Sequence, residues 1–161
     1  MYYVNIQGSR MSDQLLNNCL TVGWREWIAL PDLGINRIKA KVDTGARTSA
    51  LHAFSLESFK INNTPRVRFK IHPIQKDKNT VITCEADIYD HRFVRDSGGH
   101  KELRYVIKTD IILGNKRWPI EITLTNRDSM GFRMLLGRTA MRDLIVNPNR
   151  SFIIHNEDIF K

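Results

Sequence analysis

The sequence holds little cysteine and no long apolar run, and each shortage excludes a class of protein. Its only cysteines, Cys19 and Cys84, cannot form a disulfide framework. Apolar runs such as Ile111-Ile112-Leu113 are far shorter than the roughly 20 residues that cross a bilayer. Residues 1–20 also lack the apolar core of a secretory signal. We therefore expect a cytoplasmic protein without a membrane span.

Length and composition favour one folded domain. The chain has 161 residues, 42% of them hydrophobic, and can bury a core without a metal or a disulfide. Residues 1–21 show weak periodicity and are interpreted as a poorly determined leader. Residues 22–161 then form the domain, because no repeat or linker divides them.

An excess of basic residues suggests an acidic partner. Lysine and arginine number 25 against 17 aspartates and glutamates, a formal net charge of +8. Fifteen of them are arginine, whose guanidinium fork binds carboxylates and phosphates by paired hydrogen bonds. General solubility is the alternative explanation of this charge. Nucleic acid is not expected as a partner, because zinc-finger spacing, RRM aromatics and a Gly-x-x-Gly clamp are missing.

Short stretches of alternating apolar and polar residues predict strands. In Arg37–Val42, Ile38 and Ala40 alternate with basic residues, and Gly114-Asn115 is typical of a hairpin turn. The predicted strands are Trp24–Leu30, Arg37–Val42, Val67–Ile71, Val81–Tyr89, Tyr105–Leu113, Lys116–Leu124 and Phe152–Ile154, and the one predicted helix is Arg138–Leu144. This order predicts a mainly β, all-β-class fold with one short helix, arranged as a closed β-barrel.

One segment has the pattern of a catalytic loop. The strand predicted to end at Val42 is followed by Asp43-Thr44-Gly45-Ala46. Gly45 permits a tight backbone turn, which would present the Asp43 carboxylate at the end of the strand. An ordinary β-turn with Asp43 at its first position explains the same residues.

A second segment strengthens the interpretation of Asp43–Ala46 as a catalytic loop. Met134-Leu135-Leu136-Gly137-Arg138 follows 91 to 95 residues after Asp43. Together the two segments resemble the retroviral-type aspartic peptidases, in which a D-T-G-A loop is followed later by two aliphatic residues and Gly-Arg. The resemblance implies a retropepsin-like barrel with Asp43, Thr44 and Gly45 as the catalytic loop. It also implies that the loop is supported by Ala46, Leu135, Leu136, Gly137 and Arg138.

A wider resemblance is to a small bacterial family known as ATP-dependent zinc proteases, often encoded near ATP-grasp ligases that add glutamates to proteins. The stretches that carry it are Gly23–Trp27, Lys39–Ala53, Gly99-His100, Arg104–Ile107, Asn126–Met130 and Phe132–Arg138. The resemblance implies a substrate with an acidic, glutamate-rich peptide tail.

The residues themselves support neither ATP nor zinc. No Gly-x-x-x-x-Gly-Lys-Ser/Thr loop and no His-Glu-x-x-His motif occurs. The best candidate ligands are Cys84, Asp87 and His91, but positions 84 and 87 of a strand face opposite ways. We expect no metal and no other cofactor, and a zinc-dependent protease is the weaker alternative.

Catalysis of the aspartic type needs two carboxylates that share one proton. Asp96-Ser97-Gly98 lies only 53 residues after Asp43 and is interpreted as a mobile loop rather than a second catalytic loop. Catalysis by this route would therefore require a homodimer that contributes one Asp43 from each subunit. Assistance of a lone Asp43 by His52 is the alternative.

The sequence departs from the retroviral pattern at Arg47, where that family has an aspartate that pairs with the later arginine. Arg47 would repel Arg138, so either Arg138 pairs with Asp128 or Asp143, or Arg47 faces the cleft and binds substrate carboxylates. The residues predicted to bind substrate are Arg47, His52, Arg92, Arg104, Arg127 and Arg133. Pairing of these arginines with surface acids or backbone carbonyls is the alternative for each.

Two functions are predicted, in this order. The first is a peptidase of the retropepsin-like aspartic type that hydrolyses acidic, glutamate-rich peptide tails. The second is a non-catalytic module of the same fold that binds acidic proteins or ribosomal partners, and such binding should weaken with salt.

Overall fold

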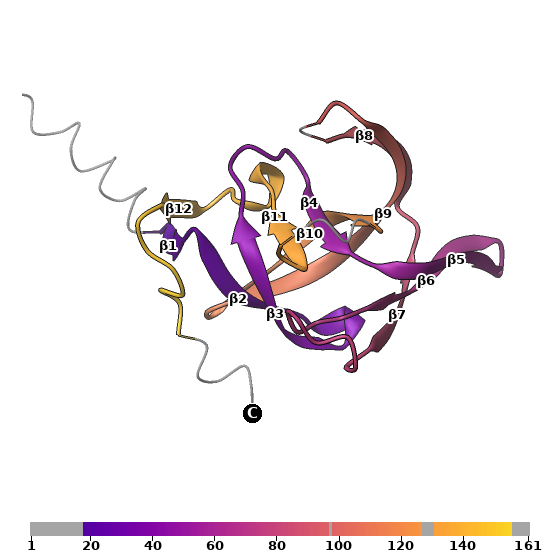
Figure 1. Ribbon diagram of the computed structural model, residues 1–161, viewed down its shortest axis with the longest axis horizontal. Coiled ribbons are helices and arrows are strands. Elements are labelled where there is room, and N and C mark those ends of the chain that lie inside the picture. Colours follow the sequence, from indigo (N-terminus) through magenta and orange to yellow (C-terminus); the bar gives the residue numbers. More distant parts are fainter. Residues whose placement is uncertain (1–17, 97, 127–130, 156–161) are drawn as a thin grey trace, which may run out of the picture.

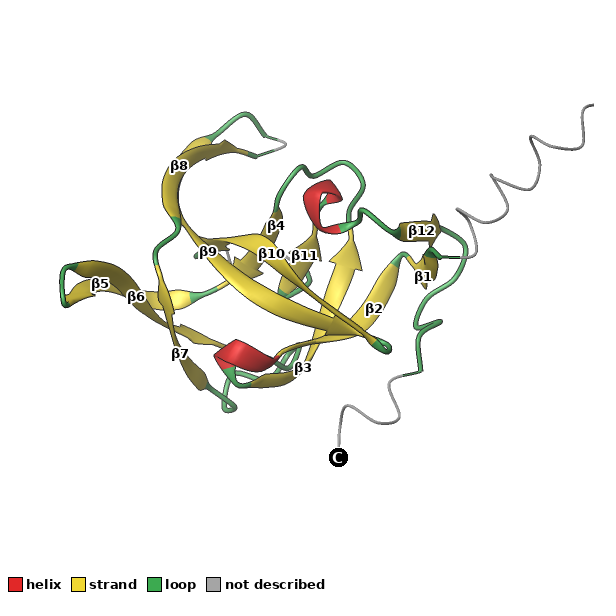
Figure 2. Ribbon diagram, turned by 180° about the vertical axis from the view of Figure 1, so that it is seen from behind, coloured by secondary structure: helices red, strands yellow, loops and turns green. Residues whose placement is uncertain are grey.

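The computed structural model describes residues 18–96, 98–126 and 131–155. Within these ranges the chain is mainly β, with two 3-10 turns and no α-helix (Figure 1; Figure 2, helices in red). The elements are β1 (Leu20–Gly23), β2 (Arg25–Leu30), η1 (Pro31–Leu33), β3 (Ile35–Val42), β4 (Ser49–His52), β5 (Phe54–Ile61), β6 (Thr64–Ile71), β7 (Ile82–Asp87), β8 (Asp90–Arg95), β9 (Lys101–Leu113), β10 (Lys116–Thr125), β11 (Met134–Leu136), η2 (Arg138–Ala140) and β12 (Leu144–Asn147). Neither 3-10 turn has the length or apolarity needed to cross a membrane.

The largest sheet closes into a ring of strands. Its order is β10-β4-β11-β3-β2-β9-β8, and β10 also pairs with β9. Strand β10 is parallel to β4 and antiparallel to β9, so hydrogen bonding runs around the ring without a break at that point. A three-stranded sheet, β5-β6-β7, extends from the side of the ring, and the pair β1-β12 lies near its other side (Figure 1).

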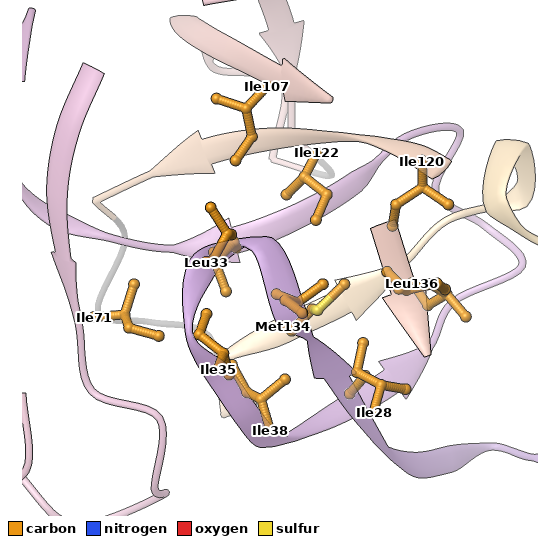
Figure 3. Packing of buried hydrophobic residues seen from close by; sticks show 14 of the residues in the cluster. Ile28, Leu33, Ile35, Ile38, Ile71, Ile107, Ile120, Ile122, Met134 and Leu136 are labelled. Carbon is orange, nitrogen blue, oxygen red and sulfur yellow. The ribbon is translucent and has the colours of Figure 1, made fainter. Parts of the chain in front are cut away.

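The core lies inside the ring and is made largely of branched aliphatic side chains (Figure 3). Strand β3 shows how the sequence builds it: Ile35, Ile38, Ala40 and Val42 are buried, whereas the residues between them are exposed or half-buried. Such alternation directs one face of a strand to the core. Full burial of one isoleucine contributes about 1.5–3 kcal/mol relative to exposure.

Six of the predicted strands, in the ring and in the three-stranded sheet, are confirmed with shifts at their ends. The predicted ranges from Trp24, Arg37, Val67 and Val81 correspond to β2, β3, β6 and β7. The predicted hairpin is β9-β10, in which Leu113 pairs with Lys116 across the two-residue turn. Gly114 in this turn has a φ of +60°, which glycine adopts without strain.

The helix predicted at Arg138–Leu144 is wrong in length and type. Only Arg138–Ala140 is helical, as a single 3-10 turn. Leu144 begins β12, which pairs in parallel with β1, Leu20 opposite Leu144. A helix this short carries the full cost of nucleation for few hydrogen bonds, so pairing with another strand prevails.

The strand predicted at Phe152–Ile154 is absent from the structure. Phe152 has a φ of +53°, which interrupts an extended conformation. The amides of Ile153 and Ile154 donate to the carboxylate of Glu26, at 2.9 and 3.3 Å, instead of to a neighbouring strand. Glu26 is 1% exposed, and its Oε1 also accepts the Gly23 amide at 2.7 Å. A buried side chain thus takes the place of a strand partner.

Several elements were not anticipated by the sequence analysis. Leu20 and Thr21, which fall in the predicted leader, belong to β1. Residues 1–17 lie outside the described ranges. Strands β4, β5 and β8 were not predicted. All four residues of β4 are buried, so the alternation that identifies a half-buried strand is missing there.

Candidate active site

Asp43 lies directly after β3, at the end of the strand, with its side chain 27% exposed. Its amide donates a 2.9 Å hydrogen bond to the Leu136 carbonyl oxygen. Its Oδ1 accepts the amide of Gly45 at 3.0 Å, and this bond turns the loop back on itself. The carboxylate is therefore held in place by the backbone while part of it remains accessible to another molecule.

The Leu-Leu-Gly segment lies beside this loop. Strand β11 runs parallel to β3, with Leu136 opposite Val42. After it, the amide of Gly137 donates to the buried Ser49 Oγ at 3.0 Å. A Cβ on residue 137 would lie 2.5 Å from the carbonyl carbon of Thr48, so this close approach of two backbones requires glycine.

The rest of the loop is attached to η2, and Figure 1 shows the connection between β3 and β4 passing this turn. The Arg138 amide donates to the Ala46 carbonyl at 2.9 Å, and the Thr139 amide to the Arg47 carbonyl at 3.0 Å. Residues Ala46 and Arg138, predicted to support the loop, are thus in direct contact with each other.

The partner of the Arg138 side chain is one that neither alternative named. Its Nη1 donates to the carbonyl oxygen of Thr44 at 3.0 Å, inside the loop that carries Asp43. Asp128 lies outside the described residues. A guanidinium can bond any backbone carbonyl, and such a partner leaves no mark in the residue pattern, so the sequence could not identify it.

Lys41 is a site residue that the sequence analysis missed. Its Nζ lies 3.8 Å from Asp43 Oδ2, and its side chain is 45% exposed. Two residues apart along the chain, the two side chains share a face, and this spacing was the available signal. Within the described residues, the Asp43 carboxylate thus contacts one backbone amide and one ammonium group.

Two of the predicted substrate-binding arginines share a pocket of about 740 Å³. Arg47 and Arg92 both line it, although Asp43 does not. The Arg92 guanidinium already binds Asp90 at 2.8 Å and Glu121 at 3.2 Å. The Asp90 pKa lies below its ordinary value because the His91 amide and Arg92 donate hydrogen bonds to that carboxylate. Arg47 is exposed, and within the described residues it has no carboxylate within 4 Å.

The other predicted substrate-binding residues that the structure describes, His52, Arg104 and Arg133, do not line this pocket. Arg104 is 8% exposed and binds Glu102 at 2.8 Å. His52 and Arg133 are buried and are joined by a 2.9 Å bond from the His52 amide to the Arg133 carbonyl. His52 and Ser49 lie at opposite ends of β4, and Ser49 is the one that contacts Gly137 beside the Asp43 loop. His52 is therefore not placed beside Asp43. Arg127 lies outside the described residues.

The candidate zinc ligands have separate surroundings. Cys84 is buried, donates to the Leu33 carbonyl at 3.3 Å, and burial raises the pKa of its thiol to about 11. Asp87 is exposed and pairs with Arg66 at 2.6 Å. The His91 ring stacks on Tyr105, with ring centroids 4.4 Å apart. In the described part of the chain, no three histidine, cysteine, aspartate or glutamate side chains converge in a way that would hold a metal ion.

The interpretation of Asp96-Ser97-Gly98 as a loop agrees with the place of its described residues. Asp96 and Gly98 lie between β8 and β9, whereas Ser97 is outside the described ranges. Asp96 Oδ1 accepts the His100 amide at 2.9 Å, so this carboxylate closes a turn of its own hairpin.

Comparison with known proteins places this chain in a family. Residues 21–157 match the RimB-like family, described as retropepsin-like aspartic endopeptidase RimB. A Shewanella pealeana protein named probable alpha-L-glutamate ligase is 48% identical over 139 residues, 86% of this chain and 30% of that protein. A Desulfotalea psychrophila protein of the same name is 48% identical over 128 residues, 79% and 28% of the two chains. This chain thus spans less than a third of the length of these curated relatives.

A solved structure shows a similar fold. The crystal structure of a Legionella pneumophila protein of unknown function has a TM-score of 0.68 and 29% sequence identity to this chain. The similarity covers 83% of this chain and 96% of the Legionella chain.

Proposed function

Because this chain belongs to the RimB-like family of retropepsin-like aspartic endopeptidases, we propose that it is a peptidase that hydrolyses acidic, glutamate-rich peptides with Asp43 as its catalytic carboxylate. The supporting observation is the position of Asp43, held by the Leu136 carbonyl and the Gly45 amide with 27% of its side chain exposed. In this proposal the closed ring of strands is the barrel of the retropepsin fold, and β11 is the floor of its catalytic loop.

The substrate class is inferred from charge and from the relatives. A net charge of +8 favours anionic peptides, and an exposed Arg47 four residues from Asp43 supplies a positive charge at the site. The relatives that share this segment are named as glutamate ligases, so a chain of linked glutamates is a substrate that the same proteins would handle.

The chemistry that we propose needs two Asp43 side chains from two subunits. Two carboxylates held close together share one proton, because both cannot be ionised at once. The ionised one removes a proton from water, and the water oxygen attacks the amide carbon. The C–N bond then breaks, its nitrogen leaves protonated, and the water oxygen stays on the new carboxyl group. Catalytic-loop residues Thr44 and Gly45 would hold the pair in position.

The test is incubation of the purified protein with a hexaglutamate peptide, with hexaglutamine as the control, followed by mass spectrometry. The proposal predicts shorter glutamate peptides, no cleavage of hexaglutamine, and no effect of a metal chelator. Loss of cleavage with chelator would identify a zinc-dependent protease instead. Retention of intact hexaglutamate on the protein, with no shorter product, would identify a non-catalytic binding module.

The dimer has its own test, in which active protein is mixed with the Asp43→Asn variant. If each site needs two Asp43 residues, activity falls below the fraction of active subunits as mixed dimers form. Activity in direct proportion to that fraction would show that one chain is sufficient.

A further inference from the structure

The pocket of about 740 Å³ lies beside the proposed catalytic loop, and its lining is strongly basic. It begins at Arg47 and Thr48, which follow the loop, and continues to Thr139 and Ala140 of η2. Its charged lining residues are Arg47, Arg92, Lys108, Lys116, Arg117, Arg142, Glu121 and Asp143, six cations against two acids. A concave surface of one sign of charge concentrates ligands of the opposite sign.

Several of these cations already have partners. Arg92 binds Asp90 and Glu121, and Arg117 binds Asp110 at 2.8 Å and Asp32 at 3.3 Å. Lys116 donates to the Asn18 carbonyl at 2.8 Å. These side chains are held by the protein itself and contribute less to the binding of a ligand.

Arg47 and Arg142 differ from the other arginines of the pocket. Both are exposed, and among the described residues neither has a carboxylate within 4 Å or a side-chain hydrogen bond. Each therefore presents its full set of guanidinium donors to the pocket, and such a fork binds a carboxylate by two parallel bonds.

The position of Arg47 is set by the same contacts that hold the catalytic loop. Its carbonyl accepts the Thr139 amide at 3.0 Å, and the preceding Ala46 carbonyl accepts the Arg138 amide. Trp118 also lines the pocket, and its ring is held in place because its Nε1 donates to the Ala140 carbonyl at 3.1 Å. This half-buried ring gives the pocket an apolar surface next to its charges.

We infer that this pocket is the subsite that selects acidic peptides, in which Arg47 and Arg142 bind side-chain carboxylates and Trp118 packs against the methylene groups of a glutamate. The inference rests on the proposed function for the nature of the ligand. A pocket of this size suits several linked residues rather than one inorganic ion. Arg47 then continues the peptide-binding surface from the catalytic loop into the pocket.

The test measures binding in a protein that carries Asp43→Asn, so that no probe is cleaved. The probe is fluorescein-labelled hexaglutamate, and its anisotropy gives the dissociation constant. The Arg47→Gln/Arg142→Gln double substitution should weaken binding at least tenfold and reduce its dependence on salt. The Arg68→Gln control removes one positive charge from the ion pair between Arg68 of β6 and Glu85 of β7, and it should change binding less than twofold.

Three results would overturn the inference: unchanged hexaglutamate binding in the double variant, equal binding of labelled hexaglutamine, or displacement of the peptide by an RNA hexamer at the same concentration as by unlabelled hexaglutamate. The single variants provide a second measurement, in which Arg142→Lys should bind more tightly than Arg142→Gln because it keeps the charge. Thermal unfolding of all variants should match, since both side chains are exposed. A protein that never cleaves the peptide would refute the proposed function and leave this binding result unaffected.

Discussion

The amide of Asp43 and the carbonyl of Leu136 are joined by a 2.9 Å hydrogen bond, although the two residues are 93 positions apart in the chain. This bond continues the parallel pairing of β3 and β11 by one residue, into the loop. The position of the proposed catalytic carboxylate therefore depends on a strand of three residues and on the close approach that follows it at Gly137.

Replacement of Gly137 by alanine should disturb this approach. The new Cβ would lie 2.5 Å from Thr48 C and 2.8 Å from Ser49 N, and backbone atoms cannot move aside as a side chain does. We expect a loss of about 1–3 kcal/mol in the free energy of unfolding, measured by urea denaturation, and loss of peptidase activity. Gly131→Ala is the matched control, because a Cβ added there would meet no atom within 4 Å. Equal stability of the two variants would contradict the structure here.

The Ser49 hydroxyl should stabilise the same approach of Gly137 to Thr48 and Ser49. It accepts the buried Gly137 amide at 3.0 Å, and Ser49→Ala leaves that donor without its partner. Such a loss costs roughly 1–3 kcal/mol. Urea denaturation should show it for Ser49→Ala and not for Ser58→Ala, a change at an exposed position of β5. A Ser49→Ala protein as stable as the parent would show that this bond contributes nothing.

Glu26 should hold the segment that follows Arg150. Its carboxylate accepts three amides, those of Gly23, Ile153 and Ile154, and Glu26→Gln replaces one acceptor oxygen by a donor. Hydrogen bonds to a charged group contribute about 1.5–3 kcal/mol. We expect faster hydrogen exchange at Ile153 and Ile154, with Glu57→Gln, an exposed change, as the control. Unchanged exchange at these two amides would mean that other contacts hold the segment.

The part of the fold that the sequence predicted, and the part that it did not, differ in their physical origin. Strand β3 and the β9-β10 hairpin were predictable because alternation and a Gly-Asn turn are local signals. Leu144, the first residue of β12, was predicted as the end of a helix, because the pairing of β12 with β1 joins residues more than 120 positions apart and leaves no local signal. The partners of Glu26 are backbone amides, which every sequence contains, so its role has no signature.

For the candidate site, motif spacing indicated the loop and its floor but not the surroundings. Lys41 beside Asp43 and the Thr44 carbonyl beside Arg138 depend on side-chain directions that only the folded chain defines. The predicted groove of arginines is likewise formed only in part. Arg47 and Arg92 share the pocket, whereas Arg104 binds Glu102 of its own strand, β9.

Cys84 should react with alkylating agents only slowly in the folded protein. Burial raises the pKa of its thiol to about 11, from an ordinary value of 9.0, so little thiolate is present at pH 8. In a Cys19→Ser background, iodoacetamide should label Cys84 at the rate of unfolding, and urea should accelerate the labelling. Rapid labelling of the folded protein would contradict the buried position.

The same raised pKa predicts how stability depends on pH. The unfolded thiol loses its proton near pH 9 and the folded one near pH 11, so stability is fully present below pH 9 and falls as the pH rises towards 11. The loss from this one group is about 2–3 kcal/mol. Subtraction of the Cys84→Ala curve isolates it from other groups, and two parallel curves between pH 8 and 11 would refute it.

Kinetics of the Asp43→Asn variant on hexaglutamate tests the central claim most directly, because the amide keeps the size of the side chain and removes its ability to take a proton. Asp87→Asn, which changes an exposed partner of Arg66, is the control. We predict that kcat/KM falls by at least a thousandfold for Asp43→Asn and stays within about twofold for Asp87→Asn. Cleavage by Asp43→Asn at the rate of the parent protein would show that another group performs the reaction.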